Sequence, residues 1–441
     1  MNPILVLGAG RSSVSLLAYL NELAIKEGFR FSVADSDEGN LQLRTAGLEA
    51  ADARIFHAAS PEALNELVRG HRIVISLLPP PMHPLAARAC LQEKANLLTA
   101  SYESAEMRAM ADEIEKAGLL FVNECGLDPG IDHMSAMEMI DEIHAEGGKV
   151  LSFRSFCGGL TADAFDDNPF RYKISWNPRN VVTAGKSGGL FLENAMPAFL
   201  PYQRLFAETE SVSIPGWGEF EAYPNRDSVP YRETYGLKSI ETLKRGTLRK
   251  KGFSRRWNFF VRAGMTDEQV TLEYREGSDY GDYLLTFFPS GNPEKDFSEF
   301  AGEQEIAADV LAMFKPAGTY RKLKSLKGSP ADFLLDLIED CWVLGKKDHD
   351  LVVMLHEMVF QSADGGKFIR QAWFGMEGED SLHTAMAKTV GLPLGILSKL
   401  LLKSCISQKG LALPLKHEFY YPILKELTNF GVRFQHISKP L

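Results

Sequence analysis

The sequence has 441 residues, of which 45% are hydrophobic and 24% charged, and its formal net charge is −10. This length is sufficient for two or three domains, and the composition is typical of a soluble globular protein. The negative charge argues against nucleic acid or an anionic membrane surface as the main partner. We find neither a signal-peptide pattern nor about 18 consecutive apolar residues, so we expect a cytoplasmic protein without a membrane span.

Cysteine and histidine spacing gives no sign of a disulfide framework or a metal site. The five cysteines are scattered and include no C-x-x-C pair, which is typical of a reducing compartment. Asp348-His349-Asp350 resembles a set of metal ligands. Because it follows two lysines and precedes an apolar strand, we interpret it as a solvated turn. The sequence therefore predicts no metal.

The chain begins with a short apolar strand, Ile4–Leu7, that runs into a glycine-rich turn. Gly8 allows the sharp bend, Gly10 lets a phosphate approach the backbone, and the next helix offers its free N–H groups. Ser13 replaces the third glycine of the usual G-x-G-x-x-G pattern and is small enough for close helix–strand packing. The turn therefore predicts a dinucleotide site made by Gly8, Gly10, Arg11, Ser12 and Ser13.

A second strand, Phe31–Ala34, ends in Asp35, about 25 residues after Gly10. This is near the spacing of the carboxylate that binds the ribose hydroxyls of a dinucleotide. Asp35 would also repel a 2′-phosphate, and no Arg or Lys follows it directly. We therefore expect NAD as the cofactor, with NADP as the alternative. A turn aspartate in a domain that binds no nucleotide is the competing interpretation.

Residues 1 to about 125 alternate apolar strands with helical segments, which predicts a parallel sheet covered by helices on both faces. Further strands are expected at 54–56, 73–78, 96–100 and 119–122, and helices at 61–68, 84–93 and 104–116. Ligands of such sheets bind beyond the carboxyl ends of the strands. Cofactor contacts are therefore expected from Ser76, Leu77 and Leu78, and Ser101 and Tyr102 are expected at the same crevice.

The turn Gly126-Leu127-Asp128-Pro129-Gly130 marks the expected boundary of a first domain over 1–125. After a helix at 132–146 the chain becomes rich in strands and turns. This predicts a mixed α/β domain over 126–394, with a helical insertion at about 266–345. The last segment, about 395–441, contains a predicted helix at 422–430 and strand at 432–437, and we expect it to pack back on the first domain.

Several strings along the chain are long and unusual in composition. They are GLDPGIDHM at 126–134, SFCGGL at 155–160, NPFRYKISW at 168–176, AYPNRDSVPYRETYG at 222–236, RGTLRKKGF at 245–253 and TAMAKTVGLP at 384–393. In this order they resemble the glutamate-forming saccharopine dehydrogenases, also called saccharopine reductases. The resemblance runs from the first strand to near the C-terminus and is weakest over 266–330.

The resemblance implies an α/β fold with three parts. These are an N-terminal Rossmann-like, doubly wound parallel sheet, a second mixed α/β domain for substrate binding and dimerisation, and a small helical domain. It also implies a homodimer that carries out reversible, nicotinamide-dependent oxidation of saccharopine to glutamate and 2-aminoadipate 6-semialdehyde. This reaction belongs to lysine metabolism, and its direction in the cell stays open.

The resemblance also implies two arginines as substrate ligands. Saccharopine carries three carboxylates, and arginine suits carboxylates because its planar guanidinium binds them through two hydrogen bonds. Arg226 and Arg245 match positions that bind substrate in the family. Gly246 and Thr247 are expected to add backbone and hydroxyl contacts.

Ser101 and Tyr102 match the family's substrate-contacting pair, and Asp128 matches a position at the cofactor crevice. The Asp128 carboxylate is expected either to hold a protonated substrate amine or to take part in proton transfer as a catalytic residue. Cys157 is interpreted as a packed residue, because hydride transfer needs no nucleophile. Lys173 would need a pKa lowered by burial to act as a base, and we assign it no role.

Two other functions stay open. Related enzymes of this architecture reduce imines formed from polyamines or from other amino acids, although retention of both arginines favours saccharopine. A nucleotide-binding protein without turnover is the alternative from another class. The intact PNRDS and RGTLR strings argue against it.

Overall fold

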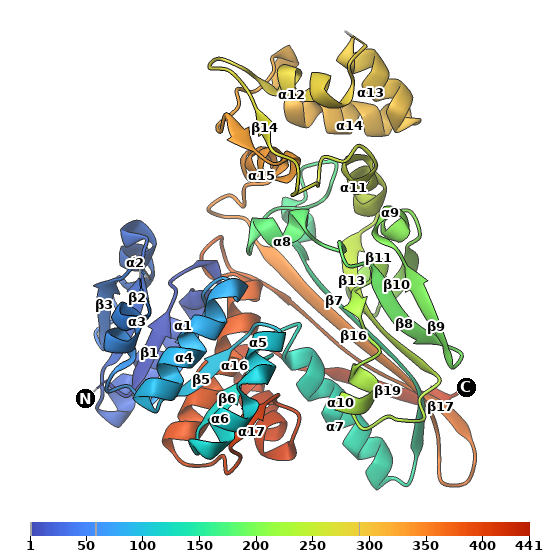
Figure 1. Ribbon diagram of the computed structural model, residues 1–441. Coiled ribbons are helices and arrows are strands. Elements are labelled where there is room, and N and C mark those ends of the chain that lie inside the picture. Colours follow the sequence, from blue (N-terminus) through green and yellow to red (C-terminus); the bar gives the residue numbers. More distant parts are fainter. Residues whose placement is uncertain (1, 58–59, 291) are drawn as a thin grey trace. The chain divides into compact units, whose positions relative to one another are not determined.

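The computed structural model describes residues 2–57, 60–290 and 292–441 and is shown in Figure 1. Its internal contacts divide the chain into two compact units. The first unit consists of Met1–Val150 together with Val359–Leu441, and the second consists of Leu151–Met358. The first unit is thus built from both ends of the chain.

The first unit contains a sheet with the strand order β18-β6-β5-β4-β1-β2-β3. Its described pairings are all parallel, and the order reverses between β1 and β4. The predicted doubly wound α/β fold is therefore confirmed. Such sheets bind their ligands outside the carboxyl ends of the strands where the order reverses. The strands are β1 (Ile4–Leu7), β2 (Phe31–Asp35), β3 (Ala51–Ile55), β4 (Ile73–Ser76), β5 (Asn96–Thr99), β6 (Leu120–Val122) and β18 (Gly410–Ala412).

The central strands are short apolar runs buried on both faces, as a sheet covered by helices requires. Every residue of β1 and β4 is buried. Local signals also start helices where the sequence predicts them. Ser60 caps α3 by accepting the backbone N–H of Ala63, and Pro61 takes the first helical position. The connecting helices are η1 (Arg11–Ser13), α1 (Val14–Glu27), α2 (Glu38–Thr45), α3 (Pro61–Val68), η2 (Pro80–Met82), α4 (His83–Glu93), α5 (Ala105–Ala109), α6 (Ala111–Lys116) and α7 (Ile131–Ala145).

α16 (Ala385–Leu402) is the longest described helix, and it is apolar enough to cross a membrane by length and composition. However, 72% of this stretch is buried inside the structure, which is typical of a core helix. α16 packs closely on α1. A Cβ on Gly395 would lie 2.7 Å from the ring of Tyr19, and one on Gly391 would lie 3.0 Å from Leu16.

The C-terminal segment also belongs to the first unit. β18 lies beside β6, α17 (His417–Leu427) packs on α7, and β19 (Gln435–Pro440) pairs with β17 (Lys367–Glu377). Two predicted starts were wrong. α17 starts five residues earlier than 422, because the buried Phe419 and Tyr420 anchor its first turn. The last strand starts at 435, where its pairing with β17 begins, and not at the predicted 432. A short helix, η5 (Thr428–Phe430), lies between them.

The second unit contains a mixed sheet with the order β10-β11-β13-β7-β16, to which β8 adds a branch with β9 and β12. β13 runs parallel to β7 and antiparallel to β11, so the predicted mixed α/β character is confirmed. The strands are β7 (Lys149–Thr161), β8 (Gly189–Glu193), β9 (Met196–Leu200), β10 (Glu210–Ile214), β11 (Gly218–Pro224), β12 (Arg226–Asp227), β13 (Thr242–Lys250) and β16 (Asp350–Gln361).

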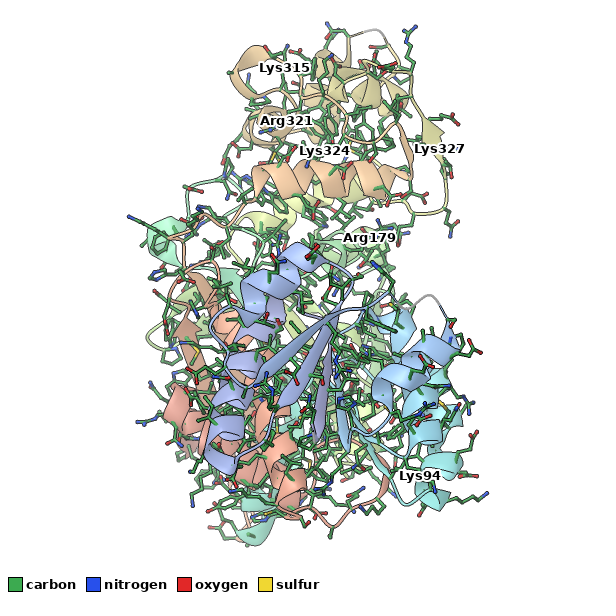
Figure 2. The ribbon with its side chains drawn as sticks, turned by 90° about the vertical axis from the view of Figure 1, so that its left-hand side faces the viewer. Lys94, Arg179, Lys315, Arg321, Lys324 and Lys327 are labelled. Carbon is green, nitrogen blue, oxygen red and sulfur yellow. The ribbon has the colours of Figure 1, made fainter. Side chains whose placement is uncertain are left out.

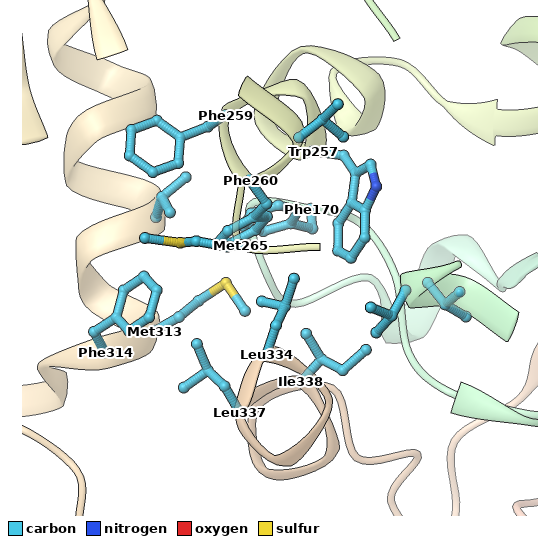
Figure 3. Packing of buried hydrophobic residues seen from close by; sticks show 14 of the residues in the cluster. Phe170, Trp257, Phe259, Phe260, Met265, Met313, Phe314, Leu334, Leu337 and Ile338 are labelled. Atoms are coloured by element: carbon cyan, nitrogen blue, oxygen red, sulfur yellow. The ribbon is translucent and has the colours of Figure 1, made fainter. Parts of the chain in front are cut away.

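Helices of the second unit enclose an aromatic core, which Figure 3 shows from close by. Trp257 and Phe260 pack there with Phe314 and Leu337, all of them fully buried. The segment predicted as a helical insertion, about 266–345, contains helices and also short strands. Short elements of this unit are η3 (Asp163–Phe165), α8 (Pro178–Val182), α9 (Tyr202–Leu205), α10 (Tyr231–Thr234), β14 (Leu272–Glu273), η4 (Pro316–Gly318) and β15 (Lys327–Gly328). The longer helices are α11 (Phe253–Arg262), α12 (Tyr280–Phe287), α13 (Pro293–Ala301), α14 (Gln304–Phe314) and α15 (Pro330–Cys341).

Basic side chains gather around residues 315–327 of this helical segment, and Figure 2 labels several of them. They have acidic partners nearby. Lys315 pairs with Glu294, and Lys324 pairs with Asp340. Such exposed pairs contribute little to stability, but they make this a surface of mixed charge rather than a purely positive one.

Candidate active site

The glycine turn after β1 has no room for a side chain at its first glycine. Gly8 has a φ of +99°, and a Cβ there would lie 3.1 Å from the carbonyl group of Leu77. Around Gly10, in contrast, no described atom other than those of Gly10 and its two chain neighbours lies within 4 Å of where a Cβ would be. The buried Ser13 hydroxyl donates to the Gly10 carbonyl at 2.8 Å and so holds the turn. A tight turn with open space at its second glycine fits the pyrophosphate of a dinucleotide.

Asp35 ties this turn to the end of β2. One of its carboxylate oxygens accepts the backbone N–H of Ala9 at 2.5 Å, and the other accepts that of Asp37 at 2.8 Å. The sequence suggests a ribose ligand that repels a 2′-phosphate. The geometry shows in addition a structural role, because both carboxylate oxygens of Asp35 already accept hydrogen bonds from backbone N–H groups.

Arg44 is a cation near this corner that the sequence analysis missed. It lies in the last turn of α2, and its Nε and Nη1 atoms are enclosed without a hydrogen-bond acceptor in the described part of the chain. Burial, and then the charge of the neighbouring Arg11, lower the pKa of Arg44. Two cations close together, one of them with two nitrogens that have no acceptor among the described residues, suit an anion such as a phosphate group.

Polar side chains meet beyond the carboxyl ends of β4 and β5. The His83 imidazole lies between Ser76, with 2.9 Å from Nδ1 to the Ser76 Oγ, and Ser101, with 2.7 Å from Nε2 to the Ser101 Oγ. The Thr99 hydroxyl lies 3.4 Å from the same Nε2. Burial lowers the pKa of His83 to about 4, so the imidazole is neutral at physiological pH. The sequence analysis named Ser76 and Ser101 but missed the histidine between them.

The next residue, Tyr102, contacts the carboxylate of Asp128, which the sequence predicts as a substrate-binding residue. Its hydroxyl donates to Oδ1 of Asp128 at 3.2 Å. Asp128 lies in a tight turn in which a Cβ on Gly130 would lie 2.1 Å from the carbonyl oxygen of Gly126. The peptide bond between Asp128 and Pro129 is cis. The structure thus brings together Tyr102, predicted from its place after the strand at 96–100, and Asp128, predicted from the string at 126–134.

A buried pair of a glutamate and a histidine links the segment of Tyr102 to the turn of Asp128. Glu124 accepts the backbone N–H of Glu103 at 3.1 Å with Oε1, and its Oε2 lies 2.8 Å from Nε2 of His133. His133 is fully buried, and Glu124 has a φ of +56°. Because Glu103 follows Tyr102 and His133 follows the Asp128 turn, this pair couples the two segments. Sequence spacing alone gave no signal for it.

In the second unit, β13 carries the predicted Arg-Gly-Thr string. Arg245 is 3% exposed, and its guanidinium lies 4.5 Å from the centre of the Tyr231 ring. The neighbouring Gly246 faces Phe156, whose Cδ1 would lie 2.7 Å from an added Cβ, so only glycine fits. Thr247 lies opposite Cys157 of the neighbouring strand β7.

The loop that carries Arg226 is bonded to the same strand. The Asn225 N–H donates to the carbonyl of Arg245 at 2.8 Å, and the Arg245 N–H donates to the Ser228 hydroxyl at 3.0 Å. Arg226 itself has a φ of +57° and an exposed side chain. The two predicted arginines therefore lie on directly bonded segments of one unit.

Two residues without an assigned role are structural. Cys157 is buried, as expected for a packed thiol. The ammonium of Lys173 hydrogen-bonds Asp167 and Asp348 at 2.7 Å each. Burial alone would lower the pKa of Lys173, but these two carboxylates outweigh it and the pKa is raised, which does not suit a base.

The solvated turn predicted at 348–350 was wrong. Asp348 is hydrogen-bonded to Lys173, and Asp350 is fully buried at the start of β16. Burial follows because β16 lies beside β7 inside the sheet. Among the described residues, no group of three His, Cys, Asp or Glu side chains has a geometry that could hold a metal ion.

The predicted residues form one set in each unit. The first unit holds the glycine turn with Gly8, Gly10, Arg11, Ser12 and Ser13, the carboxylate Asp35, the strand-end residues Ser76, Leu77 and Leu78, and the group Ser101, Tyr102 and Asp128. The second unit holds Arg226, Arg245, Gly246 and Thr247. The first set is typical of a cofactor edge and the second of a site for anions.

The doubly wound sheet, its glycine turn and the polar groups beyond β4 and β5 define an oxidoreductase of the dinucleotide-binding class. Two family descriptions match the chain: the saccharopine dehydrogenase NADP binding domain over residues 4–122 and the saccharopine dehydrogenase C-terminal domain over residues 126–432. The chain therefore belongs to the saccharopine dehydrogenase family, as the sequence strings suggest.

Individual relatives agree with this. The chain is 31% identical to the NADP(+)-dependent, L-glutamate-forming saccharopine dehydrogenase of Saccharomyces cerevisiae, over 97% of both chains. It is also 31% identical to the alpha-aminoadipic semialdehyde synthase of Arabidopsis thaliana, over 98% of this chain but 44% of that protein. The chain thus spans less than half of that relative.

Solved structures show the same architecture. The apo saccharopine dehydrogenase (L-Glu forming) of S. cerevisiae matches all of both chains with a TM-score of 0.88 and 28% sequence identity. The homospermidine synthase of Legionella pneumophila, in complex with NAD, matches 99% of this chain and 91% of its own with a TM-score of 0.56. At 8% identity, the second match shows the fold alone.

Proposed function

We propose that this chain catalyses the reversible oxidation of saccharopine to glutamate and 2-aminoadipate 6-semialdehyde. The observation that carries the proposal is the buried Arg245 on β13, bonded through its backbone to the segment of Arg226. A guanidinium taken out of water suits a carboxylate partner, and saccharopine has three. The relatives named for this reaction support the same substrate.

The cofactor that we propose is NADP rather than the NAD expected from Asp35. The family description of residues 4–122 and the names of the relatives favour NADP. Arg44 and Arg11 supply the positive charge that a 2′-phosphate requires, and the carboxylate oxygens of Asp35 are engaged by backbone N–H groups. The glycine turn has space for the pyrophosphate at Gly10.

The glycine turn with Gly8, Gly10 and Arg11 would hold the dinucleotide, which would supply the hydride chemistry at the substrate carbon next to the secondary amine. The chain's own residues bind and orient the substrate. Asp128, with the Tyr102 hydroxyl on one of its oxygens, is suited to holding a substrate nitrogen and to moving its proton. Arg226 and Arg245, with the backbone and hydroxyl of Gly246 and Thr247, are suited to its carboxylates.

The proposal extends to the assembly and the compartment. A homodimer agrees with the resemblance, and a cytoplasmic location agrees with the scattered cysteines, which include no C-x-x-C pair and are typical of a reducing compartment. Light scattering on the purified protein gives the mass in solution. A mass of one chain would overturn the dimer.

The test is an assay of nicotinamide reduction by the wild-type protein with saccharopine and either NAD or NADP. We expect turnover with saccharopine and a higher kcat/KM with NADP. Turnover confined to NAD would keep the reaction and overturn the choice of cofactor. Folded protein that binds NADP but does not oxidise saccharopine would overturn the reaction and favour another imine substrate.

A further inference from the structure

His83 lies at the carboxyl edge of the parallel sheet, where sheets of this kind bind their ligands. It is the first residue of α4 and directly follows η2, the short helix after β4. His83 is 3% exposed, and its ring bridges the carboxyl ends of two neighbouring strands, through Ser76 at the end of β4 and Ser101 after β5. The Ser76 hydroxyl is fully buried, whereas Ser101 is partly exposed. The bridge therefore begins in the core and ends on a group that a ligand can reach.

Because the imidazole is neutral, its two nitrogens have different roles in the hydrogen bonds to Ser76 and Ser101. A neutral imidazole has one nitrogen that donates and one that accepts a hydrogen bond, whereas a charged one donates from both. The two serine hydroxyls on its opposite nitrogens are therefore oriented together. The Ser101 oxygen is also held in place through its backbone, because the Ser101 N–H donates to the Thr99 hydroxyl at 3.2 Å.

A second buried histidine shows what a purely structural bridge looks like. His71 lies 3.1 Å from the Val68 carbonyl and 3.0 Å from the Ser32 hydroxyl. It precedes β4 and so lies at the opposite edge of the same sheet. The Ser32 side chain is fully buried, and no predicted ligand residue is next to it. His71 and His83 share burial and a serine partner, but His83 alone of the two reaches the ligand edge.

We propose that His83 is a positioning residue that orients the Ser101 hydroxyl toward a polar group of the bound substrate. The imidazole takes up one hydrogen-bonding direction of Ser101 and leaves the other for the substrate. Next to Ser101, Tyr102 orients Asp128, so the two neighbouring residues place two polar groups on the same ligand. The inference rests on the proposed function, because the substrate in question is saccharopine.

The test compares two replacements of His83 that each keep one of its nitrogens. The amide of His83→Gln reaches the position of Nε2 and retains the contact with Ser101. The amide of His83→Asn reaches the position of Nδ1 and retains the contact with Ser76 alone. We expect kcat/KM for saccharopine to fall about tenfold or more in His83→Asn and clearly less in His83→Gln, because one oriented hydrogen bond is lost. The dissociation constant of NADP should change little in either.

Controls separate orientation from folding and from the reaction itself. His71→Gln, the matched change at the other edge of the sheet, should retain the wild-type kcat/KM. Ser76→Ala removes the far partner of the ring without touching Ser101 and should lower kcat/KM by a smaller factor than His83→Asn. It provides the same test if the His83 variants do not fold.

Three outcomes would overturn the inference. Equal kcat/KM for wild type and His83→Asn would show that Ser101 needs no partner. An equal loss in His83→Asn and His83→Gln, with weaker NADP binding in both, would show a structural role only. A wild type that does not oxidise saccharopine would remove the proposed function, and the inference with it. That failure is distinct because it appears before any variant is compared.

Discussion

Two enclosed cations show how differently the chain treats positive charge. Lys173 in the second unit has a 7% exposed side chain with two carboxylates at 2.7 Å. Arg44 in the first unit has two enclosed guanidinium nitrogens with no acceptor in the described residues, and another arginine nearby. A buried cation is stable when it is paired, and it is costly when it is not.

The difference assigns different roles to the two sites. Lys173 is complete without a ligand, because Asp167 and Asp348 satisfy its charge. Arg44 has no such carboxylate partners among the described residues and lies near Arg11 of the glycine turn, where we propose that a phosphate binds. The comparison teaches that an unpaired cation is a better sign of an anionic ligand than a paired cation is of catalysis.

The largest effect is expected from Arg44→Ala. Loss of hydrogen bonds to a charged group costs about 1.5–3 kcal/mol, so KM for NADP should rise by about tenfold to a hundredfold. KM for NAD, which has no 2′-phosphate, should stay nearly constant. Steady-state kinetics with both cofactors measure the ratio. Arg30→Ala is the control, because Arg30 is a paired arginine that is bonded to Asp52. An equal rise for NAD and NADP would place Arg44 at the pyrophosphate instead.

Lys173→Met should act on stability and not on chemistry. Removing the ammonium leaves the partly buried Asp348 without its partner, and we expect a loss of about 1–3 kcal/mol in the free energy of unfolding. Urea unfolding measures this. kcat of the folded variant should equal that of the wild type. A fall in kcat of about a hundredfold or more would instead reveal a base at this position.

Much of the fold could be predicted because its signals are local. β1 is an apolar run that ends at Gly8, and β2 is one that ends at Asp35. Ser60 and Pro61 favour a helix start at α3, and the structure places these elements as expected. The tight Asp128 turn was also recognisable, since its glycines are required where the backbone approaches itself.

The missed residues depend on contacts between distant parts of the chain. His83 has partners 7 and 18 positions away. Asp350 looked solvated because its neighbours are charged, yet pairing of β16 buries it. Spacing in the sequence reports none of these contacts.

A smaller effect is expected from Asp35→Asn, which separates the structural bond from cofactor discrimination. The amide can accept one backbone N–H but not two, so either Ala9 or Asp37 loses its acceptor. A net hydrogen bond contributes about 1 kcal/mol, and binding of NAD and NADP should weaken by a similar factor, about tenfold or less. Dissociation constants from fluorescence titration measure both. A selective gain for NADP would show that repulsion by Asp35 decides the preference, as the sequence alone suggests.

The smallest effect is a pH dependence at the paired cation. Burial alone would raise the pKa of Asp348, but the hydrogen bonds from Lys173 and the Gly345 N–H, together with the charge of Lys173, outweigh it and the pKa is lowered. The stabilisation is therefore fully present above the ordinary aspartate pKa of about 3.9, and it is lost as the pH falls through the lowered value in the folded state. Urea unfolding between neutral and acidic pH should show a steeper acid loss for the wild type than for Asp348→Asn. The Arg44→Ala variant should follow the wild-type curve, because no carboxylate of the described residues is paired with Arg44. If Asp348→Asn followed it as well, the pair with Lys173 would contribute nothing that depends on pH, and the contrast between the two cations would rest on ligand binding alone.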